Sequence, residues 1–115
     1  MENINKPEIS FDDFLKLDLR VGTILSADDL ENSNKLIKLI VDIGGGEKRQ
    51  IVAGIKKQYK VEDLAGKQVV VIVNLPPKKL GDYESNGMLL ASHDADGLPV
   101  ALFPERQVPD GSNIS

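Results

Sequence analysis

The sequence is poor in the residues that most often carry covalent chemistry. Its 115 residues include no cysteine and a single histidine, His93. The absence of cysteine excludes disulfides, thiolate metal ligands and cysteine nucleophiles. One histidine cannot form a multi-histidine metal site, and no set of nucleophile, base and orienting residue can be assembled around it. The composition therefore argues against an enzyme and predicts no catalytic residues, no metal and no cofactor.

Aromatic residues are also scarce. The chain has no tryptophan, three phenylalanines and two tyrosines. Proteins that bind single-stranded nucleic acid without sequence preference usually present several rings, each worth about 1–3 kcal/mol of stacking per base. For a nucleic-acid ligand, this scarcity favours a folded RNA that is held through its backbone and 2′-hydroxyl groups.

Long hydrophobic runs are missing as well. The longest apolar run, residues 69–73, is far shorter than the ~20 residues that a membrane-spanning helix needs. The first six residues lack the apolar stretch of a signal peptide. We therefore expect a cytoplasmic protein with no membrane partner.

Charge is unevenly distributed, although the net charge is only −4. Residues 46–80 carry 8 Lys/Arg and 3 Asp/Glu, whereas residues 81–115 carry 1 Arg and 6 Asp/Glu. A local basic region can attract a polyanion even when the whole molecule is acidic. The basic segment predicts either such a binding surface or a solvated lysine-rich face.

The hydrophobic pattern is that of a β protein. Residues 37–43 alternate apolar and other side chains, which predicts a strand with one buried face. Residues 56–65 read instead as short helical turns that close at Gly66. Five long strands interrupted by one helical insert is the element order of an OB-type barrel. The pattern places further strands at residues 19–27, 48–55 and 68–73 and a late hairpin at 88–92 and 98–103, so that extra short strands follow at the C-terminus; hairpin turns fall at 44–46 and 94–97.

The N-terminal part divides into a leader and a helical turn. Residues 1–10 are polar and aperiodic, which predicts a flexible leader or linker before a domain spanning residues 11–115. Residues 11–17 read as a helical turn with Ser10 as its N-cap. Because Phe11, Phe14 and Leu15 fall on one face, we expect the turn to plug one end of the β core.

Polar donors gather around the predicted strand at residues 68–73. Asn74 follows this strand, and a proline pair then precedes Lys78 and Lys79. Ser85 begins the return to the next apolar strand. Amide, hydroxyl and ammonium groups at one sheet edge suit phosphates and sugars. Solubilising lysines and turn-capping polar residues would give the same pattern.

An ordered set of motifs resembles a known family. The set comprises DFLKLDLRVG at residues 13–22, NKL at 34–36, RQIVAGI at 49–55, SNGMLLA at 85–91 and VPDGS at 108–112. These segments resemble the tRNA-binding domain at the C-terminus of bacterial methionyl-tRNA synthetases. The same domain occurs as free-standing tRNA-binding proteins and in a secretion-associated chaperone. The resemblance covers residues 10–115, nearly the whole chain.

The resemblance implies an all-β OB-fold barrel whose C-terminal β additions form a homodimer. The implied ligand is tRNA, recognised by its shape, and the domain itself is non-catalytic. A synthetase catalytic domain, in cis or in trans, is a further expected partner. The implied tRNA-binding residues are Asn34, Lys35, Arg49, Asn74, Lys78, Lys79, Ser85 and Met88.

Two alternatives share the same fold. A peptide-binding chaperone would use an exposed apolar groove on the dimeric barrel. A purely structural dimerisation module would bind little RNA, which the acidic residues Asp82 and Glu84 beside the two lysines favour. Salt separates these hypotheses, because a phosphate site is steeply salt-sensitive and an apolar site is not.

Overall fold

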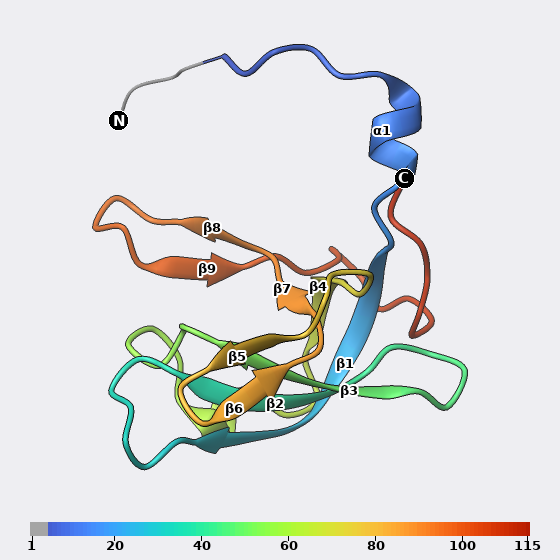
Figure 1. The fold of residues 1–115 in the computed structure, drawn as a ribbon. Coiled ribbons are helices and arrows are strands. Elements are labelled where there is room, and N and C mark those ends of the chain that lie inside the picture. The colour runs from blue at the N-terminus through green and yellow to red at the C-terminus, as the bar shows by residue number, and fades with distance from the viewer. Residues whose placement is uncertain (1–4) are drawn as a thin grey trace.

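The computed structural model describes residues 5–115, and its centre is a five-stranded antiparallel sheet in the order β3-β2-β1-β4-β7. The strands are β1 (Leu19–Asp29), β2 (Ile37–Asp42), β3 (Lys48–Ala53), β4 (Gln68–Ile72) and β7 (Met88–Leu89), with a 3₁₀ turn, η1 (Val61–Asp63), between β3 and β4 (Figure 1). The sheet rolls into a nearly closed barrel, since the Asn86 amide donates to the Gln50 carbonyl on β3 at 2.8 Å. The predicted OB-fold barrel is confirmed.

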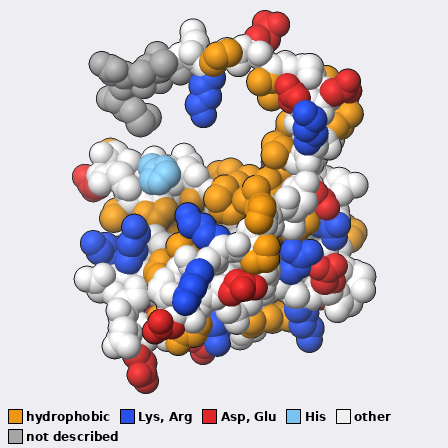
Figure 2. All heavy atoms as spheres, in the orientation of Figure 1, with side chains coloured by type: hydrophobic (Ala, Val, Ile, Leu, Met, Phe, Trp, Pro, Cys, Tyr) orange, Lys and Arg blue, Asp and Glu red, His pale blue; other side chains and the backbone are white. Residues whose placement is uncertain are grey.

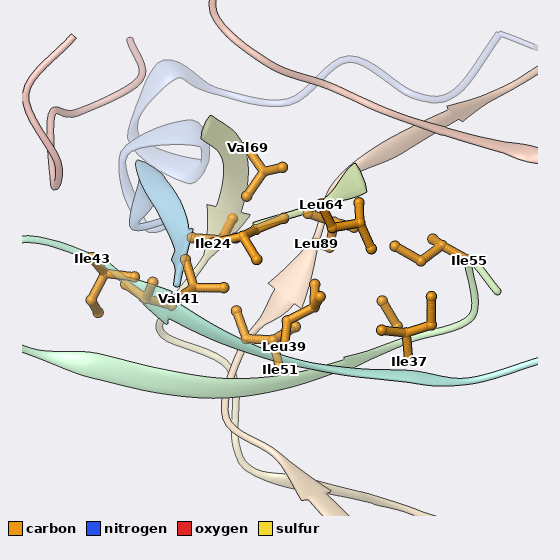
Figure 3. Close-up of a cluster of buried hydrophobic side chains, with 13 residues drawn as sticks. Ile24, Ile37, Leu39, Val41, Ile43, Ile51, Ile55, Leu64, Val69 and Leu89 are labelled. Carbon is orange, nitrogen blue, oxygen red and sulfur yellow. The ribbon is translucent and has the colours of Figure 1, made fainter. Parts of the chain in front are cut away.

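Strand β2 and the residue after it, Ile43, supply much of the core. Ile37, Leu39, Val41 and Ile43 are all 0% exposed, as their alternation predicted. They meet side chains from the other strands inside the barrel (Figure 3). Each fully buried aliphatic side chain contributes about 1.5–3 kcal/mol of hydrophobic free energy, so this strand is a main determinant of the fold.

Strand β1 is long enough to serve two partners. Residues 19–23 pair with β4 and residues 23–29 pair with β2, with an irregularity between Ile24 and Ser26. The C-terminal segment also runs beside β1, where the Val21 amide donates to the Ser112 carbonyl at 3.0 Å. At Gly111 the φ angle is +86°, and a Cβ atom would lie 2.6 Å from the Ile43 carbonyl oxygen, so only glycine fits there.

The N-terminal helix α1 (Phe11–Leu15) stands apart from the barrel (Figure 1). Ser10 caps it as predicted, because its hydroxyl accepts from the Asp13 amide at 3.1 Å. The prediction that this turn plugs the β core is wrong: Phe11 is 70% exposed and Leu15 is 60% exposed. Side chains of the strands themselves, with Ile55 and Leu64, already fill the barrel interior.

Two small hairpins leave the barrel (Figure 1). One is β5 (Lys78–Leu80) with β6 (Tyr83–Ser85), where the sequence predicted only a turn; the other is β8 (Ala91–His93) with β9 (Pro99–Ala101). The strand predicted over residues 88–92 is therefore wrong, because it is divided at Leu90 between β7 and β8. The Leu90 amide donates to Val70 of the barrel, while its carbonyl accepts from Leu102 beyond the hairpin.

The predicted leader, residues 1–10, is only partly covered, since residues 1–4 lie outside the described residues. Residues 5–10 form no helix or strand and are exposed. Within residues 5–115, no helix is long and apolar enough to span a membrane.

Candidate nucleic-acid interface

The segment from Asn74 to Asn86, which carries the β5–β6 hairpin, is held at both ends by one arginine. Arg49 on β3 donates from Nη1 to the carbonyl of Val73 at 3.0 Å and to that of Asn86 at 3.1 Å. Its Nε donates to the carboxylate of Glu47 at 2.6 Å. Arg49 therefore fixes the two stems of the segment, and its contact with RNA remains a prediction.

Ser85 forms a second attachment of the hairpin to β3. It is 4% exposed, and its hydroxyl accepts from the Val52 amide at 3.0 Å and donates to the Gly87 carbonyl at 2.9 Å. Nearby, the Gln50 side chain donates to the Glu84 carbonyl at 2.9 Å. These bonds set the position of the hairpin relative to the barrel.

Asn74 uses both ends of its amide to hold the chain between α1 and β1. Its Oδ1 accepts from the Asp18 amide at 2.9 Å, and its Nδ2 donates to the Lys16 carbonyl at 2.7 Å. The adjacent Asp18 carboxylate pairs with Arg20 at 2.9 Å, and that hydrogen bond lowers the pKa of Asp18. Asn74 thus links the barrel to the N-terminal helix.

Lys78 and Lys79 are exposed on β5. The register pairs Lys78 with Ser85 and Lys79 with Glu84. Because side chains alternate along a strand, the two lysines point to opposite faces of the hairpin, and Lys79 shares its face with Glu84. The lysine pair therefore presents charge on two sides of the ribbon.

Loop 30–36, between β1 and β2, carries two more of the predicted residues. Asn34 and Lys35 are exposed there. The stem of Lys35 lies over Gly54, where its Cε would be 3.2 Å from an added Cβ. The loop faces the β5–β6 hairpin across a pocket of about 120 Å³ that both segments line. The structure thus brings Asn34 and Lys35 to the same side of the barrel as the hairpin.

Met88 lies on β7 beside a different hollow. Its side chain is 49% exposed and borders an open groove of about 510 Å³, together with Gly54 and Leu102. The structure therefore places Met88 at an apolar groove, while the predicted charged residues surround the hairpin and loop 30–36.

Two lysines that were not selected from the sequence lie beside loop 30–36. Lys56 and Lys57 border a shallow hollow against residues 31–34. Lys56 Nζ donates to the Ser33 carbonyl at 2.8 Å, while Lys57 is exposed. Their signal was available, since they are adjacent lysines within the basic segment. We call the exposed lysines of β5, loop 30–36 and residues 56–57 the basic surface; Figure 2 shows Lys and Arg interspersed with Asp and Glu over the barrel.

The five-stranded barrel, with its hydrogen-bonded hairpin and surface loops, has the architecture of an OB-fold domain. The chain belongs to the family whose model is described as "Putative tRNA binding domain", which matches residues 19–113. The resemblance found in the sequence is thereby confirmed. The family and the solved relatives make the domain a binding module and not a catalytic one, as predicted.

The chain is similar both to a curated methionine–tRNA ligase and to solved structures of smaller proteins. The chain is 58% identical over 109 residues to the methionine–tRNA ligase of Methanothrix thermoacetophila, covering 95% of the chain and 16% of the ligase. Among solved structures it is similar to the MetRS related protein of Pyrococcus horikoshii, with a TM-score of 0.88, 38% identity, and coverage of 96% of this chain and 100% of that one. It is also similar to the chaperone CsaA of Bacillus anthracis, with a TM-score of 0.86, 38% identity, and coverage of 95% and 100%.

Proposed function

We propose that this domain binds tRNA by its folded shape and acts in the cytoplasm as a homodimer, as the C-terminal module of a methionine–tRNA ligase. The observation that carries the proposal is the basic surface, in a chain of the tRNA-binding domain family. The chain spans only 16% of the methionine–tRNA ligase it matches, so the catalytic domain of that enzyme would be a separate part in cis or in trans.

Seven of the eight predicted binding residues take two roles in this proposal, and the eighth, Met88, lies apart at the apolar groove. Lys35, Lys78 and Lys79, joined by Lys57, donate to phosphates, and Asn34 donates to the RNA backbone beside them. Arg49, Asn74 and Ser85 position the segments that carry these groups, because their polar atoms already bond within the chain.

Recognition by shape fits the arrangement of the charges. The basic surface draws on three separate segments, so a rigid backbone of matching curvature would satisfy all of them together. Contacts to phosphate and ribose carry no sequence information by themselves. A folded RNA with a fixed backbone path is therefore the ligand that this surface suits.

Binding of labelled tRNA across a salt series tests this function. Each phosphate contact contributes about 0.7–0.9 to the slope of log K against log salt. Lys78→Ala/Lys79→Ala should therefore flatten the slope by about 1.4–1.8 and weaken binding. The matched control is Lys60→Ala/Lys67→Ala, which removes two exposed lysines near η1, away from the basic surface. Salt-independent binding, or equal losses in both double variants, would contradict the phosphate grip.

Apolar side chains exposed on two parts of the molecule, α1 and the β8–β9 hairpin with the residues after it, support the homodimer. Phe11, Leu15, Val100, Leu102 and Phe103 are each 37–70% exposed. Figure 2 shows hydrophobic side chains gathered towards α1 and the β8–β9 hairpin. A five-residue helix and a lone hairpin are marginal in water without packing partners. A second copy of the chain would cover both, and we call these residues the apolar surface.

A peptide-binding role is the second candidate function. It is favoured by the open groove beside Met88, which is walled mainly by aliphatic residues, and by the similarity to a chaperone. An unfolded polypeptide should then bind with little dependence on salt, because apolar contacts are not screened. Loss of peptide binding in Met88→Glu, with tRNA binding retained, would separate the two activities.

A further inference from the structure

The small pocket between loop 30–36 and the β5–β6 hairpin has the walls of a site for a flat, partly apolar group. Its volume is about 120 Å³, the scale of a single planar ring system. Leu30, Leu36 and Leu80 supply apolar walls, and Tyr83 contributes an aromatic ring. Tyr83 shares its hairpin face with Leu80, since the register pairs these two residues.

The Tyr83 side chain lines the pocket and is partly exposed. It is 37% exposed, and its hydroxyl has no hydrogen-bond partner within residues 5–115. The other tyrosine, Tyr59, differs because its hydroxyl accepts from the Ala101 amide at 2.9 Å and so serves the fold. Nucleic acid bases stack well on exposed aromatic rings, and RNA-binding proteins read bases that have left their own stack in this way.

The edge of the pocket carries two carboxylates, from Glu31 and Asp82. Neither forms an ion pair or hydrogen bond with any residue of the described range, and both are exposed. A carboxylate repels phosphate but accepts hydrogen bonds from amino groups on base edges. Guanine, adenine and cytosine carry such amino groups and uracil does not.

From these observations we propose that the pocket takes one unpaired, amino-bearing base of the bound tRNA, stacked on Tyr83 with its edge towards Glu31 and Asp82. Lys78, on the same hairpin face, and Lys35, in the facing loop, then meet the flanking phosphates. The inference rests on the proposed tRNA binding and adds a base contact to it. It also gives the acidic residues beside the lysines a role in recognition.

Variants of Tyr83 test the stack. Tyr83→Phe keeps the ring and should bind tRNA within about twofold of the wild type. Tyr83→Leu keeps apolar bulk without a ring and should bind about 5- to 150-fold more weakly, the loss that corresponds to one stacked base. The salt slope should not change, because no charge is removed. Circular dichroism and thermal unfolding confirm that both variants fold.

Tyrosine emission gives a direct readout, since the chain has no tryptophan and two tyrosines. Addition of tRNA should quench the wild type more than Tyr83→Phe, in which the remaining signal comes from Tyr59 and also corrects for absorption by the RNA. Equal quenching, or wild-type affinity in Tyr83→Leu with the salt slope intact, overturns the base pocket and leaves the phosphate grip standing. A wild type that binds no tRNA overturns both.

Neutralising the carboxylates tests the choice of base by the sign of the effect. If Glu31 and Asp82 only face phosphates, Glu31→Gln/Asp82→Asn should tighten binding. If they accept from a base edge, the same change should weaken it by about threefold or more. Glu84→Gln is the matched control, because Glu84 lies on the other hairpin face beside Lys79 and should tighten binding. If Glu31→Gln/Asp82→Asn and Glu84→Gln both bind tRNA more tightly, the assignment of an amino-bearing base is overturned.

Discussion

The β5–β6 and β8–β9 hairpins have strands of three residues each and leave the same barrel, but they are attached differently. Side chains anchor the first: Arg49 and Gln50 donate to its backbone, and Ser85 bonds to β3. The second is held mainly through the backbone near Leu102 and by one tyrosine hydroxyl, from Tyr59. A two-stranded hairpin is marginal alone, so both need these attachments.

The surfaces of the two hairpins differ as much as their attachments. The first hairpin is polar and suited to contact with water, because it exposes four charged residues: Lys78, Lys79, Asp82 and Glu84. The second continues into Phe103, an aromatic side chain that is 70% exposed. In the proposed function, the first hairpin contacts RNA and the second contacts a protein partner.

The largest expected effect is on dimerisation through the apolar surface. Phe103→Asp would place a charge in the proposed dimer contact and should weaken dimerisation by about 30-fold or more, as loss of a buried aromatic anchor does. Sedimentation equilibrium measures this. Leu25→Asp is the matched control, since Leu25 is 44% exposed on β1 outside the apolar surface and should leave the dimer intact. A Phe103→Asp protein that dimerises as tightly as wild type would contradict the proposed interface.

An intermediate effect compares the attachments. Ser85→Ala leaves the Val52 amide without its partner in a buried position and should lower the free energy of unfolding by about 1–3 kcal/mol. Ser92→Ala makes the same change at an exposed position of β8 and should alter it by less than about 0.5 kcal/mol. Urea unfolding of both variants measures the difference, and equal stabilities would show that the hairpin does not depend on this bond.

The smallest effect concerns the β8–β9 turn. Three groups donate to the Asp94 carboxylate: the Leu98 amide, the Asp96 amide and the Gln58 side chain. These hydrogen bonds, that of Leu98 foremost, lower the pKa of Asp94 below the ordinary value of 3.8. The lowered pKa means that the stabilisation is present above about pH 4 and is lost as the pH falls through the folded-state pKa. The protection factors of the Asp96 and Leu98 amides, which correct for the intrinsic exchange rate at each pH, should therefore fall on acidification.

Asp94→Asn provides the control for that experiment, because it keeps an acceptor oxygen without a titrating charge. In this variant the protection of the turn amides should not decrease with falling pH as it does in the wild type. Acid-independent protection of Leu98 in the wild type would show that the charge of Asp94 does not hold the turn.

Local patterns in the sequence predicted local structure well. The alternation of residues 37–43 gave the buried face of β2, and Ser10 and Gly97 marked a helix start and a hairpin turn. The family was also legible, because its motifs lie in order along the chain. Such signals survive in sequence since period, caps and turns depend on residues only a few positions apart.

The roles of the candidate site residues were harder to predict. Asn74, Arg49 and Ser85 read as ligand donors, but each also bonds to a partner that lies 24–58 positions away in the chain. The break at Leu90 was invisible for the same reason, since it depends on backbone bonds to Val70 and Leu102, which are distant in the chain. Tyr83 gave no signal, because its pocket exists only where loop 30–36 meets the hairpin.

The sequence by itself determined the OB barrel, its core strands and the family, because burial period and motif order are properties of the linear chain. Only the tertiary structure decided which polar groups are engaged in the fold and which face solvent. It also decided that α1 and β9 leave apolar side chains uncovered. The physical reason is barrel closure: hydrogen-bond partners and exposed faces are assigned when distant strands meet, and no local pattern records which groups will then be satisfied.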